Sequence, residues 1–164
     1  MREIRIYAGP NILEPLRYKQ PINGLQAKFS LQFGMACILL KRRAGLREYT
    51  TAVVKSREIS ETMSKIKTFL SDEVAKMGTD KMRSIIELEL HNKQIVRKFV
   101  ETVRGMPETP IKNSELVTKF IECASFVLKE NKINQILEII RDLENKSSIK
   151  PLISLLSASA CIRE

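Results

Sequence analysis

The chain has 164 residues and a net charge of +9, and 43% of its residues are hydrophobic. This length suits one domain, or a domain with a short extension, and no apolar run approaches the roughly 20 residues of a membrane-spanning helix. The first residues lack the continuous apolar region of a signal peptide, so we predict a cytoplasmic protein with no membrane partner.

The cysteines and the single histidine do not form a recognisable metal site. Cys37, Cys123 and Cys161 are widely separated, and none belongs to a CxxC pair or lies beside His91. Because a structural zinc site needs four such ligands, we predict no metal, and we predict no cofactor. Cys37 and Cys123 have apolar neighbours, which favours small core side chains over the alternative of redox-active thiols.

Apolar periodicity predicts the elements of the first part of the chain. Ile4 and Ile6 alternate with charged residues, which is typical of a strand, whereas residues 27–42 are apolar on nearly all sides, which is typical of a buried helix. In chain order, we predict a strand at 3–8, an irregular loop, the helix at 27–42, short helices at 47–54 and 56–65, and a strand at 66–70.

The clearest local signal is a β-hairpin. Ile86, Leu88 and Leu90 alternate with acidic residues, and a second apolar run at residues 95–103 follows the polar turn at 91–93. The helical pattern then returns, and we predict helices at 114–129, 132–143 and 149–156.

These elements predict an α+β fold with a small, mostly antiparallel sheet. The sheet and its hairpin pack against helices, and the last third of the chain is helical. We expect an α+β region at residues 1–112 and C-terminal helices at 113–164, packed together as one compact unit.

The search for chemistry finds no complete catalytic set. The sequence contains no glycine-rich phosphate loop and no nucleophile elbow, and His91 lies in the predicted turn, where a solvated residue needs no function. Lys28 and Ser30 are more informative, because the start of the predicted buried helix offers free N–H groups to an anion. A capping and solubilising pair explains both residues equally well.

The excess positive charge has one dense run, Lys41-Arg42-Arg43. Such a run can bind nucleic acid. Aromatic residues make up only 5% of the chain, and no RNP-like or helix-turn-helix pattern is present, which favours a solvated basic surface.

An ordered series of segments resembles the MmgE/PrpD family, which includes 2-methylcitrate dehydratase, cis-aconitate decarboxylase and iminodisuccinate epimerase. Each motif alone is weak, but their order and spacing agree over nearly the whole chain. The segments are QAKFSLQFGMACILL at 26–40, ELELHNK at 87–93, GMPETPIKNSEL at 105–116, LVTKFIEC at 116–123 and KPLISLL at 150–156.

The resemblance implies a C-terminal, lid-containing portion only. Family members combine a large helical domain with a smaller α+β lid, and the active site lies between them. The catalytic segments of the helical domain have no counterpart in this sequence, so we predict no catalytic residue here. Lys28, Ser30 and Phe33 match the neighbourhood of the family's cleft and are the predicted substrate-binding residues. Phe33 replaces the tyrosine of many relatives and cannot donate a hydrogen bond.

The leading hypothesis is therefore part of a lyase or isomerase that acts on small polycarboxylates. The family reaction removes a proton next to a carboxylate. We expect this chain to be inactive alone and to need a helical domain, which a separate N-terminal polypeptide can supply. The alternative is a non-catalytic remnant or a self-associating module, and either hypothesis is compatible with a homo-oligomer. A basic nucleic-acid-binding domain is the third hypothesis.

Overall fold

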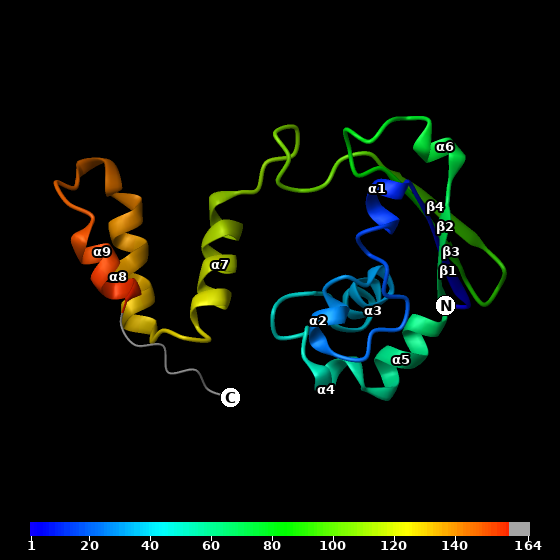
Figure 1. Ribbon diagram of the computed structural model, residues 1–164, viewed down its shortest axis with the longest axis horizontal. Coiled ribbons are helices and arrows are strands. Elements are labelled where there is room, and N and C mark those ends of the chain that lie inside the picture. The colour runs from blue at the N-terminus through cyan, green and yellow to red at the C-terminus, as the bar shows by residue number, and fades with distance from the viewer. Residues whose placement is uncertain (158–164) are drawn as a thin grey trace. The chain divides into compact units, whose positions relative to one another are not determined.

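The computed structural model describes residues 1–157, so Cys161 lies outside the described residues (Figure 1). The chain divides into two units, Met1–Thr109 and Pro110–Glu164. The packing of the sheet region and the C-terminal helices as one compact unit stays a prediction.

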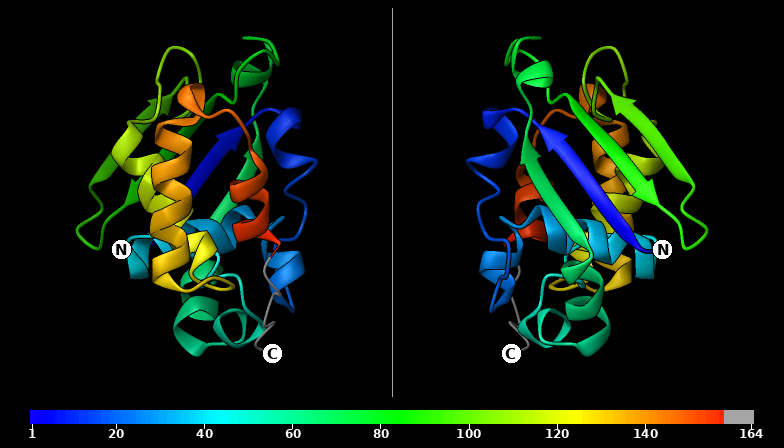
Figure 2. Two further views of the ribbon diagram at one scale, coloured as in Figure 1. Left: turned by 90° about the vertical axis from the view of Figure 1, so that its left-hand side faces the viewer. Right: turned by 90° about the vertical axis from the view of Figure 1, so that its right-hand side faces the viewer.

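Within residues 1–109, the strands form one four-stranded sheet with the order β2-β1-β3-β4 (Figure 2, right). The central β1 (Glu3–Ala8) pairs in parallel with β2 (Ile66–Leu70) and antiparallel with β3 (Ser84–Glu89). The edge strand β4 (Ile95–Val100) pairs antiparallel with β3. The predicted α+β fold is confirmed, and the parallel β1–β2 pair makes the sheet mixed.

An apolar cluster joins the sheet of the first unit to four of its helices, α2, α3, α4 and α5, whereas α1 and α6 contribute no residue to this cluster. Ile4, Ile6 and Ile66 project from the strands and meet Phe33 and Cys37 of α3. The helices are α1 (Pro10–Leu13), α2 (Gly24–Ala27), α3 (Leu31–Lys41), α4 (Thr51–Val54), α5 (Arg57–Ser64) and α6 (Asp72–Ala75).

The predicted helix at residues 27–42 begins four residues later than expected. Helix α2 ends at Ala27, and α3 begins only at Leu31. The reason is capping: Ser30 is extended, and its Oγ accepts a hydrogen bond of 3.2 Å from the backbone N–H of Phe33. Serine stabilises a helix more at this position than inside the first turn. The helix predicted at 47–54 is likewise shorter, because Thr50 caps α4.

Close packing between α2 and the segment before α4 depends on Gly24. A Cβ atom on this residue would lie 2.3 Å from the backbone oxygen of Tyr49, which no side chain tolerates. Glycine therefore lets the two backbones touch and brings α2 and α4 together.

The predicted hairpin is present, and its turn places a lysine in the left-handed region. The N–H of Lys93 donates to the backbone oxygen of Leu90 at 3.0 Å, and the N–H of Leu90 donates to Gln94 at 2.9 Å. Lys93 has a φ of 66°, although asparagine tolerates the left-handed region better than lysine does. Asn92 instead accepts a hydrogen bond from the N–H of Gln94 through its side chain.

Lys93→Gly is expected to raise the free energy of unfolding by about 0.5–1 kcal/mol, because glycine adopts this φ without the strain of a Cβ atom. Urea unfolding measures the change. Lys98→Gly is the matched control, since Lys98 is an exposed lysine in extended β4, where glycine should lower stability. Equal effects of the two substitutions would contradict the conformational explanation.

The second unit contains the predicted helices, seen as α7 (Asn113–Ala124), α8 (Glu130–Arg141) and α9 (Lys150–Leu156), with a 3-10 turn at Leu143–Asn145. Its small core is built from α7 and α8, through Ala124, Ile133 and Leu137. Across residues 1–157, no helix is both long and apolar enough to cross a membrane.

Candidate functional site

The predicted binding residues Lys28, Ser30 and Phe33 do not share one accessible surface. Lys28 is exposed at the end of α2. Ser30 is only 4% exposed and uses its hydroxyl to cap α3. Phe33 is fully buried, and its ring lies 5.2 Å from the ring of Tyr49. A contact of these residues with substrate stays a prediction, and in this unit Ser30 and Phe33 have structural roles.

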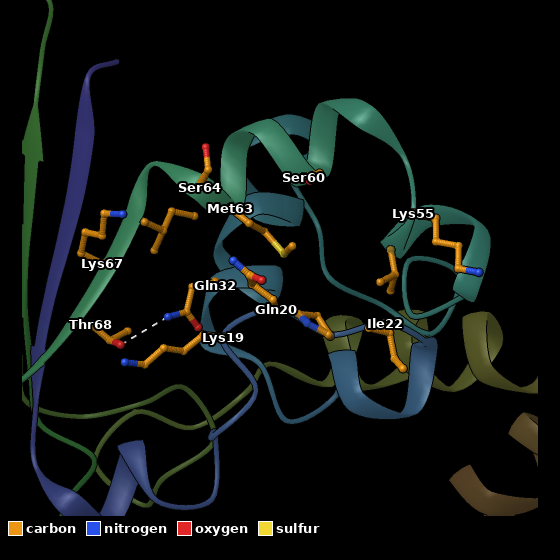
Figure 3. A pocket seen from close by; sticks show the side chains of 13 residues that line it. Lys19, Gln20, Ile22, Gln32, Lys55, Ser60, Met63, Ser64, Lys67 and Thr68 are labelled. Atoms are coloured by element: carbon orange, nitrogen blue, oxygen red, sulfur yellow. Dashed lines mark hydrogen bonds between the residues drawn. The ribbon is translucent and has the colours of Figure 1, made fainter.

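A pocket of about 570 Å³ lies on the same unit, beside α3 (Figure 3). We call it the lysine pocket. Its walls come from segments far apart in the sequence: the loop before α2, the first turn of α3, the end of α4, helix α5 and strand β2. The lining residues are Lys19, Gln20, Pro21, Ile22, Gln32, Val54, Lys55, Ser60, Met63, Ser64, Ile66, Lys67 and Thr68.

The charge of the lysine pocket is entirely positive. Lys19, Lys55 and Lys67 line it, and none of the described lining residues is an Asp or Glu. The described residues form no ion pair with any of these lysines. Figure 3 shows Lys19 and Lys67 at the end of the pocket near Thr68, with Lys55 at the opposite end. A concave surface with charge of one sign attracts ligands of the opposite sign.

The floor of the lysine pocket contains a buried amide with an unused acceptor. Gln32 is 4% exposed, and its Nε2 donates a hydrogen bond of 3.3 Å to Oγ1 of Thr68 on β2. Its Oε1 is buried and has no hydrogen-bond partner among the described residues. A buried acceptor without a donor costs about 1–3 kcal/mol, so this atom favours a ligand that donates to it.

Sequence reasoning did not find the lysine pocket. Lys19, Lys55 and Lys67 have no diagnostic spacing, and several long-range contacts bring their segments together: the Arg17–Ser30 bridge and the packing of α2 on α4, of α3 on α5 and of α3 on β2. Gln32 did carry a usable signal, since it is a long polar residue in a helix that is otherwise apolar on nearly all sides. His91 is exposed in the β3–β4 turn and is not among the residues that line the pocket.

The remaining basic feature, the run Lys41-Arg42-Arg43, is partly neutralised. The Arg43 guanidinium donates to Glu48 at 2.8 Å, and the other carboxylate oxygen of Glu48 accepts from the N–H of Gly45 at the same distance. Glu48 is buried, so this ion pair orders the loop after α3. Nucleic-acid binding through this run stays a prediction.

Comparison with known families agrees with the ordered motifs. The model of the MmgE/PrpD C-terminal domain matches residues 1–145, which include the whole lysine pocket, α7 and α8. The closing motif at residues 150–156 lies beyond the matched range. No curated protein matches the chain. The chain therefore belongs to the MmgE/PrpD family, and it carries that family's C-terminal domain.

Proposed function

We propose that this chain is the lid-containing, carboxylate-binding part of an MmgE/PrpD-type lyase or isomerase that acts on small polycarboxylates. The lysine pocket is the observation that carries the proposal. Lys19, Lys55 and Lys67 come from different segments and offer ammonium groups that no described acid occupies. Charge-assisted hydrogen bonds from such groups to carboxylates are stronger than neutral ones.

The pocket has groups that can bind the carboxylates of a substrate, but its described lining residues include none that can accept a proton from it. When a proton next to a carboxylate is removed, negative charge develops on that carboxylate, and a fixed cation stabilises it. None of the described lining residues is an Asp, Glu or His that could accept the proton. The catalytic acid and base therefore come from the family's helical domain, in the same or a separate polypeptide. A cytoplasmic location stays a sequence-based prediction.

Binding of citrate, a tricarboxylate probe, tests this function. The double variant Lys19→Gln/Lys67→Gln is expected to weaken citrate binding about tenfold, because each exposed charge pair contributes about 0.5–1 kcal/mol. Isothermal titration calorimetry measures the dissociation constant at low ionic strength. Lys93→Gln/Lys98→Gln is the matched control, since it removes the same charge from the exposed hairpin outside the pocket.

Two results would contradict the proposal. One is the absence of citrate binding at millimolar concentration, and the other is an equal loss of affinity in the pocket and control variants. Turnover of a methylcitrate-like acid by the chain alone would contradict only its dependence on a helical domain.

A self-associating module is the second candidate, and the second unit favours it. This unit exposes large apolar side chains to solvent, although α7 and α8 are amphipathic and also have polar faces. Leu116, Ile121, Phe126, Ile153 and Leu156 are each 40% exposed or more. Surfaces of this kind are buried in oligomers. Sedimentation as a monomer at high concentration would eliminate this candidate.

A further inference from the structure

We propose that Gln32 determines the ligand specificity of the lysine pocket, and that its Oε1 accepts a hydrogen bond from a hydroxyl group of the bound acid. This inference rests on the proposed function, because it requires a polycarboxylate in the pocket. A hydrogen bond to Oε1 lets the pocket distinguish hydroxylated acids from the same acids without a hydroxyl, which charge alone cannot do.

The amide of Gln32 is held in place before a ligand binds. Its Nε2 donates to Oγ1 of Thr68 at 3.3 Å, and its side chain is buried between α3 and β2. The other end of the same amide, Oε1, is buried without a donor. Most buried polar atoms in folded proteins have a partner. Gln32 lines the pocket, so its orphaned acceptor is a position where a ligand that reaches it gains affinity by donating.

The chemistry of Oε1 restricts which ligand group can satisfy it. An ionised carboxylate has only acceptor atoms and cannot donate to Oε1, whereas a hydroxyl group can. The pocket therefore offers two kinds of hydrogen bond: Lys19 and Lys67 donate to carboxylates, and Gln32 accepts from a hydroxyl. Lys19 is exposed and unpaired among the described residues, so its side chain can rearrange around the ligand.

A hydroxy polycarboxylate can make both kinds of hydrogen bond, whereas its dehydrated or deoxygenated counterpart can make only those to the lysines. The counterpart would leave Oε1 buried and unpaired in the complex. Sites that are built to accept a substrate hydroxyl discriminate strongly against analogues that lack it. The lysine pocket is therefore expected to prefer the hydrated partner of a hydration–dehydration pair.

Citrate and tricarballylate provide the test, because they carry the same three carboxylates and differ only by the hydroxyl group. Calorimetry on the full chain is expected to show citrate binding about tenfold more tightly. Gln32→Met, which keeps the length of the side chain, is expected to reduce the preference to less than about twofold. Affinity for tricarballylate should stay unchanged. Gln20→Met is the matched control, since Gln20 also lines the pocket but is exposed.

A second variant keeps the test valid if Gln32→Met does not fold. Thr68→Val removes the acceptor that holds the amide and is expected to reduce the preference for citrate without removing Gln32. Equal binding of citrate and tricarballylate by the unmodified chain would overturn this inference and leave the proposed function standing. A preference that persists in folded Gln32→Met would also overturn it. Failure of both acids to bind would overturn the proposed function itself.

Discussion

Replacing Phe33 by alanine is expected to lower the free energy of unfolding of the first unit by about 3–5 kcal/mol. Phe33 is fully buried in the cluster that joins α3 to β1 and β2, and its ring packs on Tyr49. Truncation to alanine loses the favourable transfer free energy of the ring. It also leaves a cavity that α3 and the strands around it cannot close. Urea unfolding of the full chain, followed by hydrogen exchange of β1 amides, measures the loss.

The chain offers a matched control in Phe29, which is 45% exposed and lies between α2 and α3. Phe29→Ala should cost less than about 1 kcal/mol. Similar losses in the two variants would refute the assignment of Phe33 to the core.

Cys37 is expected to react with iodoacetamide at least about a hundredfold more slowly than Cys123 at pH 8. Burial, and to a smaller degree the charge of Glu48, raises the pKa of the Cys37 thiol from 9.0 to about 11. The thiolate is the reactive form, and two pKa units reduce its population a hundredfold. Cys37 is buried as predicted, whereas Cys123 is exposed, so the prediction of a core position was wrong for Cys123. Peptide mass spectrometry of a Cys161→Ser chain compares the two alkylation rates.

The same shift predicts a loss of stability at high pH. The folded state keeps the Cys37 proton up to about pH 11, whereas the unfolded chain releases it near pH 9. Because the unfolded chain then binds fewer protons, the free energy of unfolding falls between these values, by about 2–3 kcal/mol. Cys37→Ala should remove this contribution. Equal alkylation rates in the native chain, or identical pH profiles for both chains, would contradict the buried thiol.

Local patterns predicted the local parts of the fold. The hairpin could be predicted because strict alternation and a short polar turn are adjacent in the sequence, and α8 because Ile133, Ile136 and Leu137 repeat at helical spacing. The predicted start of α3 was wrong because apolar periodicity carries no information about capping. Ser30 stabilises the helix from the position just before its first residue. The residue of the turn with a positive φ could not be read from composition, which favours Asn92, because the hydrogen bonds of the turn place Lys93 in that region.

The candidate site was less predictable than the fold, for a different physical reason. Lys19, Lys55 and Lys67 look like ordinary surface residues in the sequence, and only long-range contacts place them on one pocket. Lys67 is on β2, Lys55 follows α4, and the bridge between Arg17 and Ser30 holds the loop that carries Lys19. The sequence indicated the anionic ligand through the family resemblance and placed it near Lys28. The structure adds a second candidate position in the next helix, α3, where Gln32 is buried.

The position of β1 at the centre of the sheet has a consequence for the order of folding. β1 is translated before both of its partners, and all of residues 9–65 separate it from β2. Closing so long a loop costs entropy before any strand contact repays it, so high contact order should make this step slow. The β3–β4 hairpin needs only its short turn. During synthesis, β1 therefore has no strand partner until β2 has emerged from the ribosome, and its unpaired edges are open to non-native association in that interval.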